Sequence, residues 1–171
     1  MRDVQSGVLT VEDPAGVIDP AIGARAFGET PLGKECGMRL EGVRTRFFLE
    51  RGLFGGTPFR VEIVFEGERL ARVDLTVHMA GDEKGWDGWT QEGEQRRKAL
   101  GEAWAEQAFG RKMEAKPIVM EDGTEIVPFE KTWDLPRRIG FEGGEVVSYY
   151  DSKASFAGVV VRYSEKLETP N

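Results

Sequence analysis

The sequence has only one cysteine and one histidine among its 171 residues. Cys36 has no partner for an intramolecular disulfide or for a cysteine-rich zinc site, so the fold must form without such a cross-link. His78 alone excludes metal sites built on several histidines and leaves at most one conventional general base. These absences favour a reducing compartment and predict no metal centre.

Long apolar runs and nucleotide-binding glycine motifs are also missing. No apolar stretch approaches the roughly 18 residues that span a bilayer, and the N-terminus lacks the apolar core of a signal peptide. No Gly-x-Ser-x-Gly, Gly-x-Gly-x-x-Gly or Gly-x-x-x-x-Gly-Lys-Ser/Thr pattern occurs, so sites for acyl transfer, dinucleotides and nucleotide phosphates have no support. We therefore expect a cytoplasmic protein that neither enters a membrane nor binds a cofactor.

Basic residues are outnumbered, with 30 Asp and Glu against 23 Lys and Arg and a net charge of −7. A negative field repels nucleic-acid phosphates and anionic lipids and favours basic proteins as partners. Negative charge also aids solubility without any partner, and that alternative stays open. The ordinary composition and the length predict a single domain, 1–171, with a polar tail from about residue 165.

Alternating apolar and polar residues predict an antiparallel sheet built from hairpins. The clearest hairpin has apolar rows in 59–65 and 71–79. A two-residue turn at 67–68 would place the core row of one strand opposite the polar row of the other, so a longer loop or a bulge is predicted, with Phe65 opposite Ala71. Further strands are predicted at 8–11, 38–50, 145–150 and 157–163, and on both sides of the Asp122-Gly123 turn.

One long helix is predicted to begin after Thr90 as N-cap, to run to about Phe109 and to end at Gly110. Its apolar side should lie on the sheet and its charged side in water. The apolar set is Leu100, Ala103, Trp104 and Ala108, and the charged set is Arg96, Arg97, Lys98, Glu102 and Glu106. A short N-terminal helix is predicted over 19–27, opened by Asp19-Pro20. The predicted class is α+β, with the long amphipathic helix packed on the antiparallel sheet.

Two acidic loops carry the candidate contact residues. The loop before the long helix contains Asp82, Glu83, Trp86, Asp87 and Trp89, and the tip of a later hairpin contains Glu121 and Asp122. Tryptophans are enriched at binding hot spots, although residues such as Trp86 and Trp89 more often pack under the start of the helix. The acidic spacing does not match an EF-hand, so the loops are either solvated charge or a surface for a basic protein.

An enzymatic interpretation would rest on His78 or on a pair of carboxylates. His78 is expected on the polar face of its strand near Asp74, without a nucleophile signature beside it. Two carboxylates can act as acid and base in a glycosidase, but the sequence brings no particular pair together. Lys34 can lower the pKa of the nearby Cys36 thiol, yet an inert thiol is the expected state. No catalytic residue is assigned.

Four segments share a likeness with known sequences: Pro31-Leu32-Gly33, Trp86-Asp87-Gly88-Trp89, 144–153 and 159–163. Together they resemble small bacterial immunity proteins encoded beside secreted toxins, from whose shorter pattern an insertion around 117–133 departs. The resemblance implies a protein that binds a cognate toxin domain and blocks its active site or substrate access. The acidity of this sequence suits a basic toxin, with the two acidic loops as the expected contacts. The alternatives are an adaptor module of a secretion system and a small hydrolase that uses His78 or a carboxylate pair.

Overall fold

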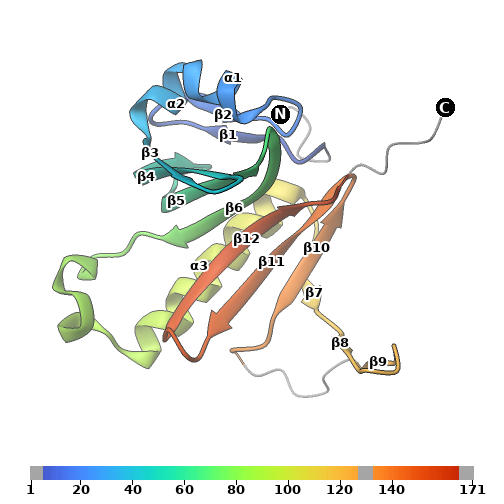
Figure 1. Cartoon of the computed structure of the whole chain (residues 1–171). Coiled ribbons are helices and arrows are strands. Elements are labelled where there is room, and N and C mark those ends of the chain that lie inside the picture. Colours follow the sequence, from blue (N-terminus) through green and yellow to red (C-terminus); the bar gives the residue numbers. More distant parts are fainter. Residues whose placement is uncertain (1–5, 127–132, 166–171) are drawn as a thin grey trace.

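The computed structural model describes residues 6–126 and 133–165 and has an α+β fold, shown in Figure 1. Eight strands form one antiparallel sheet in the order β3-β4-β5-β6-β12-β11-β10-β7. They are β3 (Gly37–Glu41), β4 (Arg44–Phe54), β5 (Thr57–Glu66), β6 (Arg69–Val77), β7 (Glu114–Ala115), β10 (Arg137–Phe141), β11 (Gly144–Asp151) and β12 (Phe156–Tyr163). Because β6 pairs with β12, strands from both halves of the chain share one sheet.

The N-terminal segment adds a small layer to this sheet. It contains β1 (Leu9–Val11), β2 (Gly16–Ile18), α1 (Ala24–Glu29) and α2 (Pro31–Glu35). Phe27 of α1 packs against Phe47 and Phe65, with ring centroids 4.9 and 5.8 Å apart. The predicted helix start at Asp19 is wrong, because the carbonyl of Asp19 accepts the Ile22 amide in a turn and the helix begins only after that turn.

A bulge sets the register of the β5–β6 hairpin. Ile63 pairs with Val73, as aligned apolar rows require. Phe65 faces Leu70 and not Ala71, so Ala71 is the extra residue and the turn keeps two residues. The predicted bulge is therefore confirmed, and the predicted Phe65–Ala71 pair is wrong.

The segment predicted as one strand over 38–50 is a hairpin. β3 and β4 are joined by a turn at Gly42 and Val43, so Val43 is exposed and does not reach the core. β4 continues to Phe54, past the predicted strand end at residue 50, because the pairing with β5 shifts between Leu49 and Gly52 and the strand accommodates the irregularity. The sheet therefore has one more strand than predicted for this segment, the edge strand β3.

The long helix α3 (Gln91–Phe109) crosses the sheet, with its caps as predicted. The Thr90 hydroxyl accepts the Gly93 amide at 2.9 Å, and Gly110 ends the helix in the left-handed conformation. Trp104 belongs to the same hydrophobic core as the N-terminal layer and packs on Phe59 with ring centroids 5.1 Å apart. The helix therefore helps to close the core on one face of the sheet.

The side of α3 that faces the sheet matches the prediction only in part: Trp104 is buried as predicted, whereas other residues of the two predicted sets have changed sides. Leu100 and Ala103 are exposed, whereas Lys98 is only 4% exposed. The buried side consists of Glu94, Lys98, Gly101, Trp104, Ala105 and Phe109. Gly101 permits close packing, because a Cβ there would lie 2.7 Å from a methyl group of Val159. The buried helix side is therefore partly charged.

Two smaller elements complete the described chain. The 3-10 segment η2 (Asp82–Gly88) connects β6 to α3, and β8 (Ile118–Val119) pairs with β9 (Glu125–Ile126) across the predicted Asp122-Gly123 turn. β11 and β12 confirm the predicted C-terminal hairpin, while β10 had no recognisable pattern. Over the described ranges, we find no helix with the length and apolarity needed to span a membrane.

Candidate functional site

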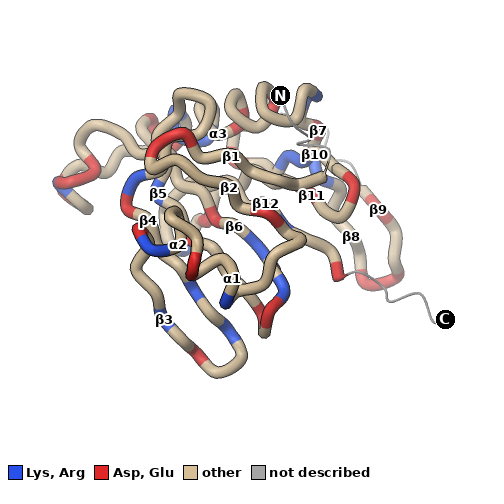
Figure 2. The backbone as a smooth tube through the Cα atoms, turned by 90° about the horizontal axis from the view of Figure 1, so that it is seen from above, with Lys and Arg blue, Asp and Glu red and all other residues tan. Residues whose placement is uncertain are grey.

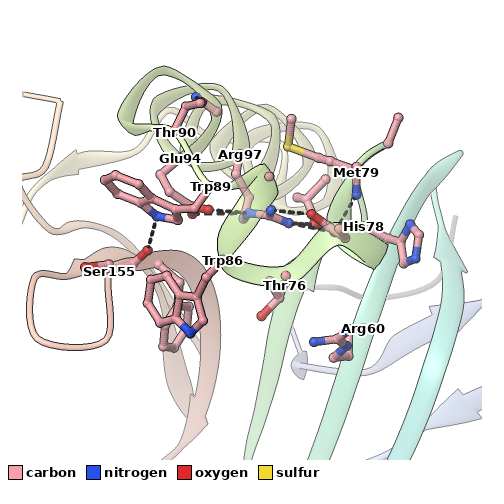
Figure 3. A pocket seen from close by; sticks show the side chains of 18 of the residues that line it. Arg60, Thr76, His78, Met79, Trp86, Trp89, Thr90, Glu94, Arg97 and Ser155 are labelled. Atoms are coloured by element: carbon pink, nitrogen blue, oxygen red, sulfur yellow. Dashed lines mark hydrogen bonds and ion pairs between the residues drawn. The ribbon is translucent and has the colours of Figure 1, made fainter.

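A cavity of about 460 Å³ lies where the end of β6, η2, the start of α3 and the β11–β12 turn meet (Figure 3). Three predicted contact residues, Asp82, Trp86 and Trp89, belong to its lining. They share it with polar side chains from distant parts of the chain, among them Arg60, Thr76, His78, Glu94, Arg97 and Ser155. This cavity is the candidate functional site.

Arg97 organises the interior of the site (Figure 3). Its guanidinium donates to both carboxylate oxygens of Asp82, at 2.7 and 3.1 Å, and its Nε lies 3.2 Å from a carboxylate oxygen of Glu94. It also donates to the carbonyl of Val77. Because the Arg97 side chain is only 11% exposed, these contacts are partly shielded from water. We call Asp82, Glu94 and Arg97 the Arg97 cluster.

Both carboxylates of the Arg97 cluster also bind backbone amides. The Met79 amide donates to Asp82 at 2.9 Å, which fixes the chain where it leaves β6. The Ala157 amide donates to Glu94 at 2.9 Å, which fixes the start of β12. The cluster therefore connects three segments that are separate in the sequence.

The electrostatics favour the charged forms of Asp82 and Arg97. Burial acts to raise the pKa of Asp82, but hydrogen bonds from Arg97 and from the Met79 amide outweigh it and hold the pKa below its ordinary value of 3.8. Burial acts to lower the pKa of Arg97, and the bonds to Asp82 and Glu94 reverse that effect. A glycosidase acid needs a raised pKa, so Asp82 has the opposite of the required shift.

The two tryptophans of the site differ in their exposure to solvent and in their contacts. Trp89 is 38% exposed, and its Nε1 donates to the carbonyl of Ser155 at 2.7 Å, which ties the β11–β12 turn to the start of α3. Trp86 is 74% exposed at the cavity. The expectation that Trp86 packs under the helix start is therefore wrong, because most of its surface lies in solvent.

His78 follows the last residue of β6, is exposed and lines the cavity. Its amide donates to the Pro58 carbonyl at 2.8 Å, so its backbone position is fixed by β5. Figure 3 shows His78 and Ser155 on opposite sides of the site. This separation does not provide the direct contact between a base and a hydroxyl nucleophile that acyl transfer requires.

The remaining predicted contacts fall in two places. Glu83 and Asp87 belong to η2 beside Trp86 and are exposed. Glu121 and Asp122 lie at the tip of the β8–β9 hairpin, where the Asp122 carboxylate accepts the Thr124 amide at 2.9 Å. Figure 1 shows this hairpin on the other side of the molecule from the green η2 segment. The structure therefore joins the first five predicted residues and leaves the hairpin tip apart.

Cys36 is a protonated, partly buried thiol. Burial, followed by the nearby charge of Glu35, raises its pKa to about 11, and its Sγ donates to the Leu32 carbonyl at 3.3 Å. The expected inert thiol agrees with this environment. Within residues 6–126 and 133–165, no group of three His, Cys, Asp or Glu side chains is arranged to hold a metal ion.

Sequence reasoning missed the residues that organise the site. Glu94 and Arg97 are three positions apart on a helix, which is a readable ion-pair spacing. Their contacts with Asp82 and Ala157 depend on the tertiary structure.

Comparison with protein-family models, curated proteins and solved structures finds no significant match to this chain. The resemblance to immunity proteins therefore stays a prediction.

Proposed function

We propose that this protein is an immunity protein that binds a basic toxin domain through η2, with Trp86 as the central contact. The observation that carries the proposal is a largely exposed Trp86 on a segment fixed by the Arg97 cluster. A fixed aromatic side chain loses little conformational entropy on binding, so it contributes more affinity than one on an unanchored loop. The sequence resemblance supplies the class of partner.

The charges beside Trp86 support a basic partner. Arg97 already neutralises Asp82, so Asp82 acts mainly by holding η2 in place. Glu83 and Asp87 remain exposed on the same segment and can attract a positively charged surface. The predicted contacts thus have different roles: Asp82 positions the segment, Glu83 and Asp87 speed association, and Trp86 slows dissociation.

Replacing Trp86 tests the proposal most directly. Tagged wild type and Trp86→Ala are purified from the cells that produce the protein naturally, the retained proteins are compared, and the affinity of a recombinant partner is measured. We expect a basic toxin domain that binds the variant about 30-fold more weakly, the effect of losing a hot spot of about 2 kcal/mol. The melting temperature should not change, because the Trp86 side chain is mostly in solvent.

Charge reversal separates the two acidic loops. Glu83→Lys with Asp87→Lys should slow association with the toxin, whereas Glu121→Lys with Asp122→Lys, the matched reversal at the hairpin tip, should leave it unchanged. Growth of cells that express the toxin should require the wild-type surface. Equal affinity of Trp86→Ala and wild type would refute binding through η2, and a constant secretion component in place of a toxin would favour the adaptor alternative.

A further inference from the structure

The large sheet has two edges of different character. At one edge, β7 pairs for only two residues and is soon followed by Pro117, which limits further strand pairing. At the other edge, β3 pairs with β4 over five residues and contains no proline. Figure 2 shows β3 at the rim of the molecule. Among the residues that the structure describes, the β3 edge therefore offers a longer strand to another chain than β7 does.

The outer side of β3 has free backbone groups at defined positions. In an antiparallel hairpin with a two-residue turn, the second and fourth residues before the turn direct their amide and carbonyl away from the partner strand. The turn lies at 42–43, so in β3 these residues are Leu40 and Met38. The positions that can accept a new strand therefore carry apolar side chains.

The side chains of β3 form two rows. Met38 and Leu40 point to the side of the sheet that carries the buried Phe47, yet they are 61% and 68% exposed. Arg39 and Glu41 form the opposite row, with Arg39 Nη1 lying 3.7 Å from Glu41 Oε1. An added strand would have to match an apolar row on one side and a mixed-charge row on the other.

A second copy of β3 meets these requirements in one register. If two β3 strands pair antiparallel about Leu40, Leu40 lies opposite Leu40, and Arg39 of each copy lies opposite Glu41 of the other. Pairing about Arg39 would place like charges opposite each other, and a one-residue shift would mix the two rows. The sequence of β3 is thus complementary to itself around a twofold axis at Leu40.

We propose that the protein forms a symmetric dimer through antiparallel pairing of β3, centred on Leu40. The contact joins two eight-stranded sheets edge to edge and gives each Arg39 a second carboxylate, from the other copy. Because the paired segment is short, the dimer is of the weak class and depends on concentration. The surface does not include Trp86 or η2, so this inference is independent of the proposed function.

Charge exchange across the twofold axis tests the register. Sedimentation velocity from about 1 µM to about 1 mM should show reversible dimers of the wild type. Arg39→Glu places Glu opposite Glu41 twice, and Glu41→Arg places Arg opposite Arg39 twice. Each variant alone should raise the dimer dissociation constant about tenfold, because like charges directly opposite are destabilising. An equimolar mixture of the two variants restores both charge pairs and should form heterodimers of wild-type affinity.

Arg96→Glu is the matched control, since it changes the net charge by the same amount as Arg39→Glu at an exposed position on α3. It should dimerise like the wild type, and melting temperatures should show that every variant is folded. A wild type that stays monomeric over the whole concentration range would overturn the proposal. The proposal would also be overturned if neither single variant raised the dimer dissociation constant, or if the mixture of the two variants did not regain the wild-type affinity.

Discussion

Two charged clusters lie along the buried side of α3, and they hold different parts of the molecule. The Arg97 cluster connects α3 to η2 and to the start of β12. In the second cluster, the Lys98 ammonium binds Glu102 and lies 3.3 Å from the Ser148 hydroxyl, which donates to Glu102 at 2.7 Å. We call Lys98, Glu102 and Ser148 the Lys98 cluster.

The two clusters differ in what they touch. The Arg97 cluster binds two backbone amides and one backbone carbonyl, and it lines the cavity. The Lys98 cluster joins side chains of α3 and β11, with Arg137 3.6 Å from Glu102. The comparison indicates that the first cluster positions a surface segment, whereas the second positions the helix on the sheet.

The largest expected effect follows replacement of Arg97. Arg97→Met leaves the Asp82 and Glu94 carboxylates close together without their shared cation, so we expect a loss of about 3 kcal/mol in the free energy of unfolding. It should also weaken binding of the proposed toxin partner, because η2 loses its attachment to α3. Urea unfolding and a binding assay on the folded variant measure the two effects. A loss below about 1 kcal/mol would mean that the backbone bonds alone hold the segment.

A smaller effect is expected at the Lys98 cluster. In Lys98→Met, Glu102 keeps the Ser148 hydrogen bond and the nearby Arg137, so the expected loss is about 2 kcal/mol. Partner binding should be unchanged, since this cluster does not line the cavity. Arg96→Met, on the exposed side of the same helix, should change stability by less than about 0.5 kcal/mol. Weakened binding in Lys98→Met would show that the two clusters act as one unit.

Local sequence patterns predict much of this fold because the deciding forces are local. Thr90 and Gly110 set the ends of α3 through capping, and the alternation in β5 and β6 requires a bulge whatever surrounds it. The buried side of α3 is different. Lys98 can be buried because Ser148, fifty positions away in the sequence, and Glu102 satisfy its ammonium group. Hydrophobic periodicity alone therefore placed Trp104 correctly but assigned Lys98 to the solvent side.

In the candidate site, too, some residues were recognisable from the local sequence and others were not. Trp86, Trp89 and Asp82 were recognisable because tryptophan and acidic residues concentrate in one glycine-rich loop. The role of Arg97 was not recognisable, since its main partner, Asp82, lies fifteen positions away across a chain reversal. Composition can therefore identify a candidate surface. It cannot separate the residues that hold that surface from those that face solvent.

Replacing Asp82 should have a smaller effect than replacing Arg97 or Lys98, and this effect depends on pH. The folded pKa of Asp82 lies below its ordinary value of 3.8, so its stabilisation is fully present above the unfolded pKa and is lost as the pH falls through the folded value. Asp82→Asn should therefore be about 1 kcal/mol less stable than wild type at neutral pH, with a constant difference down to about pH 5 that shrinks below about pH 4. Unfolding curves across this range measure the difference.

In the Arg97→Met background, Asp82→Asn should instead increase the free energy of unfolding, because it then removes a carboxylate that no longer has its cation. The same loss in both backgrounds would mean that Asp82 stabilises the fold through the Met79 amide and not through Arg97.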